Sequence, residues 1–269
     1  MPLQLPEVLR ALEQLAPLQL AESWDNVGLL LPGRRDRSVT RVALTIDLTG
    51  EVVREVLDRS VDLVVSYHPP IFKGLQRLRR DVPMEAAVLA LIEDGVALYS
   101  PHSALDAAEK GMNHWLASLA GDGRIDPLIP LAAPLTGAGL GRVNLLQRPS
   151  SVADLVERFR AGTGAPHLRL APADSLSAVV DAVVVGAGAS GGLFGGWLAA
   201  YPGRALVVSG ELRHHDALGW AERGHVVLQL EHDASERGYL PTLRAQLAAL
   251  VGDVEVVVAA ADRPLYRCV

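Results

Sequence analysis

Short apolar runs alternate with amphipathic segments along the first half of the chain. Apolar residues spaced three and four apart predict helices at 6–16, 51–59 and 84–94. Continuous apolar runs that end at turn residues predict strands at 27–31, 41–47, 62–67 and 96–100. Because strands and helices that alternate in this way build mostly parallel sheets, the pattern indicates an α/β fold.

The same alternation returns in the second half of the chain. It predicts strands at 141–146, 181–185, 204–209, 226–230 and 254–258, and helices at 151–160, 216–223 and 235–250. Pro241 falls inside the last of these helices, where it would kink the helix or delay its start.

Residues 121–141 are rich in glycine, proline and alanine without periodicity, which predicts a linker or domain crossing. We therefore expect two α/β domains with mixed, mostly parallel sheets. One comprises residues 1–125 with 230–269 and the other residues 126–229.

Composition narrows the class of protein. The 269 residues include 25 Lys+Arg and 31 Asp+Glu, a net charge of −6, which disfavours a protein that binds nucleic acid by neutralising phosphates. The single cysteine, Cys268, excludes an internal disulfide and a cysteine-rich zinc site, so histidines and carboxylates would have to bind any metal. With neither a secretory signal nor a long apolar run in view, we expect a cytoplasmic protein without membrane contact.

Two predicted strands are each followed by a histidine and, four positions later, a carboxylate. Strand 96–100 precedes His102 and Asp106, and strand 226–230 precedes His232 and Glu236, while Tyr67-His68 closes strand 62–67. Ligands in open α/β sheets collect beyond the carboxyl ends of strands.

These positions predict a divalent-metal site formed by His68, Asp106, His232 and Glu236. The mixed nitrogen and oxygen set leaves zinc, iron, manganese and nickel open. A competing interpretation is purely structural. Asp233-x-x-Glu236 is also typical of a capping box, and His102 or Asp106 could cap the next segment.

Two further motifs follow strands. Residues 211–216 place His214 and His215 between acids, which suits proton transfer but also a solvated helix start. Gly186-x-Gly188-x-x-Gly191, with Glu211 20 residues further on, matches a dinucleotide-binding fingerprint. The intervening helix would be short and interrupted by glycines, so a simple glycine turn is the alternative.

Five motifs in this order resemble the dinuclear-metal-centre family of Ngg1-interacting-factor-like proteins, also called GTP cyclohydrolase type 2 homologues. They occupy residues 22–29 (Glu-Ser-Trp-Asp-Asn-Val-Gly-Leu), 66–72, 99–106, 209–216 and 231–238. The resemblance implies α/β domains around a metal-lined cavity and a homohexameric ring. It also implies that His68 and Asp106 bind one metal, that His232 binds the other, and that Glu236 bridges both.

Tyr67 departs from the common pattern of that family, which has a histidine there. A neutral phenol, with a pKa of about 10, is a poorer ligand than imidazole. The sequence is therefore compatible with one bound metal or with two. If a second metal binds, His102 or water would take the place of the missing histidine ligand.

The resulting hypothesis is a metal-dependent hydrolase of a small, polar, nucleotide-like metabolite. His102, His214 or His215 would move protons. The alternatives are a metal carrier or insertion factor, a ring-shaped interaction scaffold, and a dinucleotide-binding oxidoreductase.

Overall fold

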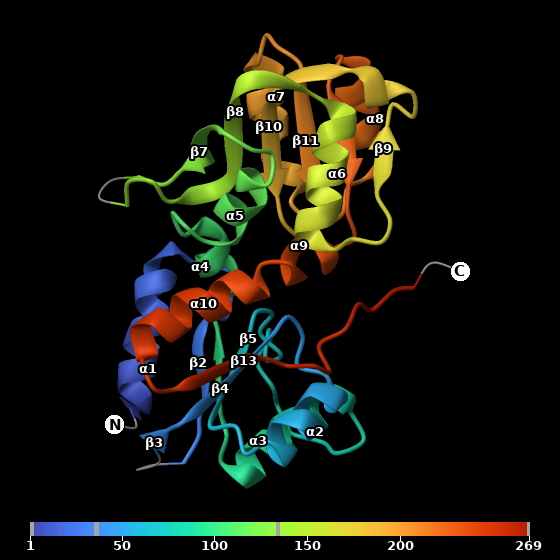
Figure 1. Cartoon of the computed structure of the whole chain (residues 1–269). Coiled ribbons are helices and arrows are strands. Elements are labelled where there is room, and N and C mark those ends of the chain that lie inside the picture. Colours follow the sequence, from blue (N-terminus) through green and yellow to red (C-terminus); the bar gives the residue numbers. More distant parts are fainter. Residues whose placement is uncertain (1–2, 35–37, 133–134, 268–269) are drawn as a thin grey trace. The chain divides into compact units, whose positions relative to one another are not determined.

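The chain folds as two compact units, shown in a computed structural model that describes residues 3–34, 38–132 and 135–267 (Figure 1). One unit comprises residues 1–105 with 240–264, and the other residues 106–239 with 265–269. The boundaries expected from the sequence pattern, after residue 125 and before residue 230, differ from these. Cys268 lies outside the described residues.

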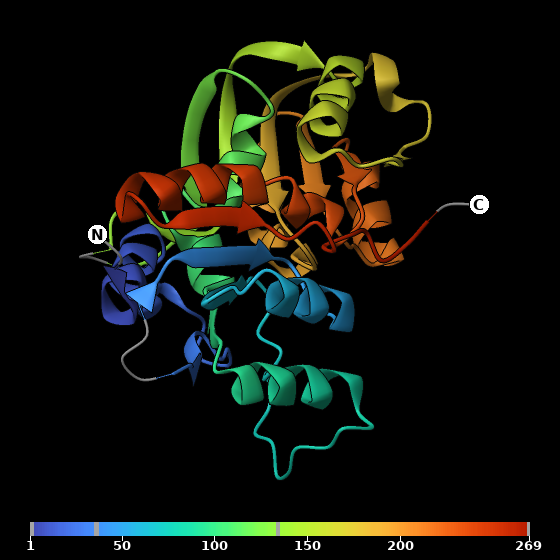
Figure 2. The same ribbon diagram turned by 60° about the horizontal axis from the view of Figure 1, so that its bottom comes forward.

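A five-stranded sheet organises the first unit, in the order β13-β4-β5-β6-β2. Its strands are β2 (Gly28–Pro32), β4 (Arg41–Thr45), β5 (Leu63–Ser66), β6 (Ala97–Ser100) and β13 (Glu255–Val258). All neighbours are parallel except β2, which runs antiparallel to β6. Figure 2 shows β13, from the end of the chain, lying beside β4. A separate antiparallel pair joins β1 (Leu3–Gln4) to β3 (Ser38–Val39).

Helices cover this sheet because its strands are buried on both faces. They are α1 (Leu5–Leu15), the 3-10 turn η1 (Leu18–Leu20), α2 (Gly50–Asp58), α3 (Pro83–Asp94) and α10 (Leu240–Val251). Val52 of α2 and Leu91 of α3 pack in one core with Val64 of β5. α10 packs against α1, β4 and β13. No helix among the described residues is long and apolar enough to cross a membrane.

The second unit is built on a six-stranded mixed sheet, in the order β7-β8-β10-β11-β12-β9. Its strands are β7 (Gly123–Pro130), β8 (Gly139–Ser151), β9 (Arg169–Ala171), β10 (Val179–Gly186), β11 (Ala205–Ser209) and β12 (Val226–Gln229). β10, β11 and β12 are parallel and the other pairs antiparallel. The predicted class, α/β with mixed and largely parallel sheets, is confirmed.

The remaining elements connect or cover these strands. They are α4 (His102–Ala107), α5 (Met112–Ser118), α6 (Val152–Thr163), η2 (Ser175–Ser177), η3 (Gly191–Leu193), α7 (Gly195–Ala200), α8 (His214–Glu222) and α9 (Ala234–Arg237). α5 packs on β8 and β10, so this segment belongs to the second unit.

Two local predictions were wrong. Residues 121–141 are not a linker, because β7 pairs there with β8 over residues 123–130. Pro127 is tolerated since β7 is an edge strand, where an amide on the outer side has no ladder partner. Residues 133 and 134 of that stretch lie outside the described residues. The helix predicted at 235–250 is two helices, and Pro241 sits in the first turn of the second, as a delayed start requires.

Candidate metal centre

Three parallel strands of the second unit end at the same edge of its sheet. β10 runs into the glycine-rich segment 186–192, β11 into residues 209–216, and β12 into His232. Because the carboxyl ends of parallel strands share an edge, these three segments converge there. Several of the residues singled out in the sequence therefore meet at one place in this unit.

His232 and Glu236 form a close pair at that edge. Nε2 of His232 lies 3.2 Å from Oε1 of Glu236, and Nδ1 lies 3.3 Å from Oε1 of Glu211. His232 lies in the turn that precedes α9 and Glu236 lies within α9, and this turn brings the imidazole and the carboxylate together. Glu236 is only 2% exposed, so its carboxylate lies where a cationic partner stabilises it most.

Gly188 makes room for this pair. Its φ of +59° is left-handed, and a Cβ at this position would lie 2.6 Å from Oε1 of Glu236 and 3.2 Å from Nε2 of His232. Its amide donates to Oγ of Ser235 at 2.9 Å, and that hydroxyl donates to the carbonyl of His232 at 2.6 Å. The glycine-rich segment thus cradles side chains of its own unit. It continues into η3 and the six-residue α7, which favours the glycine-turn interpretation over a dinucleotide site.

Asp106 is tied to the same segment through a buried asparagine. Nδ2 of Asn113 donates to the carbonyl oxygen of Asp106 at 3.2 Å, and its Oδ1 accepts from the amide of Ala187 at 2.8 Å. Asn113 is 3% exposed, so both bonds are shielded from water. One side-chain amide therefore connects the backbone of Asp106 to the turn that cradles His232 and Glu236.

Arg142 fixes the chain around Asp106 from the other side. Its buried guanidinium donates to the carbonyls of Ala107, Ala108, Gly139 and Gly141. Burial lowers the pKa of Arg142 to about 10, although Asp106 and Glu109 oppose that shift. Sequence reasoning missed both Arg142 and Asn113. The signal available for Arg142 was a charged residue inside a predicted strand, at 141–146.

His68 and His102 lie together in the first unit. His68 follows β5, and its Nδ1 lies 2.9 Å from Oδ1 of Asp47. The ring centroids of His68 and His102 are 5.4 Å apart, and the buried ring of Tyr67 lies 4.9 Å from the first and 5.4 Å from the second. The first unit thus groups one predicted ligand with one predicted proton-transfer residue and with Tyr67.

A carboxylate that sequence reasoning did not single out orients His102. Both oxygens of Asp25 lie 2.8 Å from Nδ1 of His102, and the amide of Ser103 donates to Oδ2 at 3.0 Å. Burial alone would raise the pKa of Asp25. The hydrogen bonds from His102 and Ser103 and the charge of His102 outweigh it, so the pKa falls from 3.8 to about 2. Asp25 is therefore ionised at neutral pH and fixes Nδ1 of His102 as a proton donor.

The backbone of His102 is held in an unusual conformation. Its φ is +25°, one of two positive φ values at non-glycine residues in the described ranges. Such strain persists where the surroundings over-determine it, as the bonds to Asp25 do here, and it clusters at functional sites. The signal for Asp25 was its place within the motif at residues 22–29, 77 positions from His102.

His214 and His215 occupy the first turn of α8. Their rings lie 5.3 Å apart in an edge-to-face arrangement, and both side chains are exposed. Neither imidazole forms a hydrogen bond or ion pair with another residue of the described chain. Their proposed part in proton transfer stays a prediction beside the solvated helix start.

The residues of the second unit fit a divalent cation. An imidazole nitrogen and a buried carboxylate oxygen converge over a glycine that has no side chain, and this donor set suits zinc, iron, manganese or nickel. Glu211 at the other ring nitrogen of His232 is the outer partner that ligand histidines usually have. The other histidine predicted as a ligand, His68, belongs to the first unit.

Fold and site together define a two-unit α/β protein with a candidate histidine–carboxylate metal centre. The chain belongs to the Duf34/NIF3 (NGG1p interacting factor 3) family, whose sequence profile matches residues 3–264. It is 36% identical over 239 residues to NIF3-like protein 1 of Drosophila melanogaster. The matched region covers 88% of this chain and 79% of that protein. It is 28% identical over 258 residues to a GTP cyclohydrolase 1 type 2 homolog of Clostridium perfringens, covering 95% and 96%. The family predicted from the five motifs is confirmed.

Solved structures share the fold over the whole chain. A Staphylococcus aureus hypothetical protein is 21% identical with a TM-score of 0.85, and covers 100% of both chains. A Bacillus cereus protein related to NIF3 is 16% identical with a TM-score of 0.83, and covers 98% of each. At these identities the likeness concerns the fold.

Proposed function

We propose that this protein is a metal-dependent hydrolase of a small nucleotide-like metabolite. The observation that carries the proposal is the pairing of His232 with the buried Glu236 over Gly188, where a side chain at 188 would leave no space. The name of the Clostridium perfringens relative, a GTP cyclohydrolase 1 type 2 homolog, supports the hydrolytic class and the nucleotide-like substrate.

The proposed ligands are His68, Asp106, His232 and Glu236, and they would hold one divalent ion or two. Tyr67 favours a single ion, because a neutral phenol replaces an imidazole. A divalent cation held by these residues would lower the pKa of water, so that hydroxide is available as a nucleophile at neutral pH, and would polarise a substrate oxygen. Zinc, iron, manganese and nickel all suit the donor set.

The chain's own residues orient these groups and move protons. Oε1 of Glu211 lies 3.3 Å from Nδ1 of His232, which leaves Nε2 as the nitrogen that would bind the metal. Asp25 holds Nδ1 of His102 in the same way, so Nε2 of His102 is the atom that would take or give a proton. His214 and His215 remain further candidates for this step.

The proposal extends to assembly and location. We propose a cytoplasmic homohexamer that acts on a small polar metabolite. The net charge of −6 supports a small-molecule partner rather than nucleic acid, and a single cysteine suits a reducing compartment.

Metal analysis of the purified protein tests the site. We expect bound divalent metal in the wild type and its loss in the double variant His232→Ala/Glu236→Ala, because two of the proposed ligands disappear together. His167→Ala is the matched control, since that histidine is exposed and lies on no strand end, and it should keep the wild-type stoichiometry. Unchanged metal content in the double variant would refute the site.

Hydrolysis needs a separate assay. Metal-saturated protein is incubated with GTP and a panel of phosphorylated metabolites, and the products are separated by chromatography. Turnover that depends on the metal supports the hydrolase. Rapid metal transfer to an apo-acceptor without any hydrolysis would instead favour a metal carrier.

A further inference from the structure

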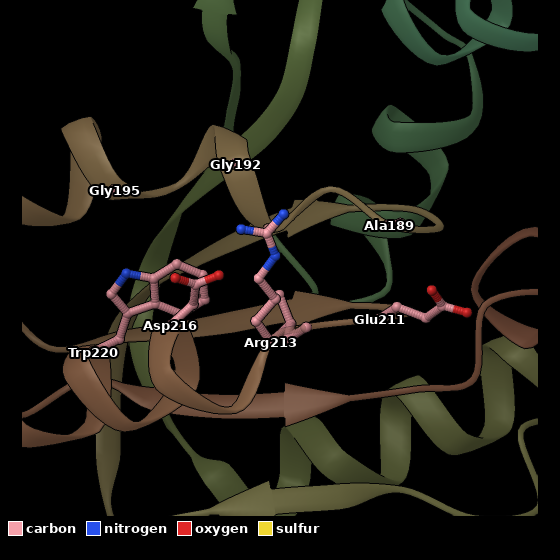
Figure 3. Close-up of a pocket in the computed structure, with 9 residues that line it drawn as sticks. Ala189, Gly192, Gly195, Glu211, Arg213, Asp216 and Trp220 are labelled. Atoms are coloured by element: carbon pink, nitrogen blue, oxygen red, sulfur yellow. The ribbon is translucent and has the colours of Figure 1, made fainter.

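A cavity of about 560 Å³ opens at the strand edge of the second unit (Figure 3). Its lining residues come from the glycine-rich segment after β10 and from the segment after β11: Ala189, Gly191, Gly192, Gly195, Glu211, Leu212, Arg213, Asp216 and Trp220. The volume falls within the range of sites for small metabolites, about 300–1,000 Å³. None of the proposed metal ligands lines it.

Backbone forms one wall of the cavity. Gly191, Gly192 and Gly195 present no side chains, and a Cβ at Gly192 or Gly195 would meet no atom within 4 Å. A wall of this kind lets a ligand approach main-chain N–H groups closely, which is how glycine-rich segments receive oxyanions.

The opposite wall carries a cation that the protein itself does not neutralise. Figure 3 shows the guanidinium of Arg213 projecting toward the glycine segment, between Asp216 and Trp220 on one side and Glu211 on the other. Within the described ranges, the side chain of Arg213 forms no ion pair or hydrogen bond.

The two acids of the cavity have favourable surroundings of their own. Glu211 lies 3.3 Å from Nδ1 of His232. Asp216 stands in the first turn of the nine-residue α8, where the helix dipole favours a negative charge. The charge left to be complemented by a ligand is therefore that of Arg213, whose planar fork matches carboxylate and phosphate oxygens.

Apolar side chains complete the site. Trp220 is 7% exposed and packs edge-to-face on Phe194, with ring centroids 5.6 Å apart, so it is a fixed surface. Together with Leu212 it can contact the carbon skeleton of a ligand whose charged group is held by Arg213.

We infer that this cavity binds the oxyanion group, phosphate or carboxylate, of a small metabolite through Arg213 and the glycine backbone. Glu211 belongs both to the cavity wall and to the surroundings of His232, so a molecule anchored at Arg213 extends toward the candidate metal centre. That the bound molecule is the substrate rests on the proposed function, whereas the anion site itself does not.

Calorimetric titration of the full-length, metal-free protein with inorganic phosphate, and separately with acetate, tests the inference. Metal is removed first because phosphate also binds cations. We expect saturable binding of at least one anion, and an affinity about tenfold lower in Arg213→Ala. Gly192→Leu should reduce binding as strongly, because it adds a bulky side chain at a lining position where a Cβ meets no atom within 4 Å.

Two matched controls separate a site from general electrostatics. Arg223→Ala removes the same charge from the other end of α8, and Gly196→Leu adds the same side chain at an exposed glycine outside the cavity. Both should bind within about twofold of the wild type. Equal losses in Arg213→Ala and Arg223→Ala, or the absence of saturable binding to either anion, would overturn the inference. Since no metal is present, either result leaves the proposed metal site to its own test.

Discussion

Asp25 sets the state of a histidine far away in the sequence. It joins the loop before β2 to the start of α4 and keeps its charge there because three polar groups outweigh its burial. We predict that Asp25→Asn lowers the free energy of unfolding near pH 7 by about 2 kcal/mol, since a buried charge-assisted network is lost. A carboxyl with a depressed pKa stabilises the fold above its unfolded value of 3.8, and this contribution is lost as the pH falls toward 2. The difference between variant and wild type should therefore shrink over that window.

Denaturant titrations at several pH values measure this effect, with the exposed Asp58→Asn as the control. Nitrogen-15 spectra of the histidine rings provide a readout that general destabilisation would not change. In the wild type the Nδ1 proton of His102 should be fixed, and in Asp25→Asn the ring should exchange between tautomers. Identical His102 spectra in both proteins would show that Asp25 does not position this ring.

The sequence was enough to pair His232 with Glu236, but it did not reveal the residues that hold the surrounding segments in place. A local pattern identifies His232 and Glu236, because they follow the end of a predicted strand and lie four positions apart. Asp25 and Arg142 act on segments tens of residues away, and nothing in their local sequence reveals which carbonyl or imidazole they will meet. A long-range hydrogen bond becomes visible only once the fold brings its two partners together.

At the scale of elements, Glu55 anchors the segment after β13 to α2. Its carboxylate accepts from the amides of Ala260 at 3.0 Å and Ala261 at 2.7 Å. Burial would raise the pKa of Glu55, but these amides and Arg59 lower it below 4.5. We predict that Glu55→Gln lowers the free energy of unfolding by about 1–2 kcal/mol near pH 7. A carboxyl with a lowered pKa contributes its full stabilisation above 4.5 and loses it as the pH falls through the lowered pKa, so the difference between variant and wild type should disappear at low pH.

Urea unfolding followed by circular dichroism at neutral and acid pH checks this expectation. Glu51→Gln is the matched control on the same helix, because Glu51 is exposed and its pairing with Arg54 is loose at 3.7 Å. It should change stability by less than about 0.5 kcal/mol. A pH-independent cost in Glu55→Gln would mean that packing, and not the charge, holds this segment.

Element prediction succeeded where one strand or helix carries its own periodicity. The buried runs of β4, β5, β10 and β11 are continuous and apolar, so their existence follows from composition alone. β7 was not predicted, because its segment is rich in proline and glycine, as linkers are. It forms a strand because it pairs with β8. An edge strand forms through hydrogen bonds to one neighbouring strand, and its own sequence need only be compatible with that pairing.

At the scale of the whole molecule, alternation of strands and helices was enough for the α/β class, because that alternation constrains topology strongly. It was not enough for the unit boundaries, which fall near residues 105 and 240. The segment containing α5 and β7 joins the second unit through packing on β8, and no change in local composition marks that transition.

The proposed hexamer gives the last prediction. Trp24 and Phe72 are 58% and 44% exposed, and their ring centroids are 5.9 Å apart, so the first unit presents an apolar pair to its surroundings. Exposed apolar clusters of this kind are typical of surfaces that bind a ligand or another chain. We expect light scattering to give a mass six times the 28.6 kDa of one chain. Because obligate interfaces are largely apolar, this mass should persist on dilution and in high salt. A mass near that of one chain would contradict the hexamer, while the proposed metal and anion sites, which are argued from residues of one chain, keep their own tests.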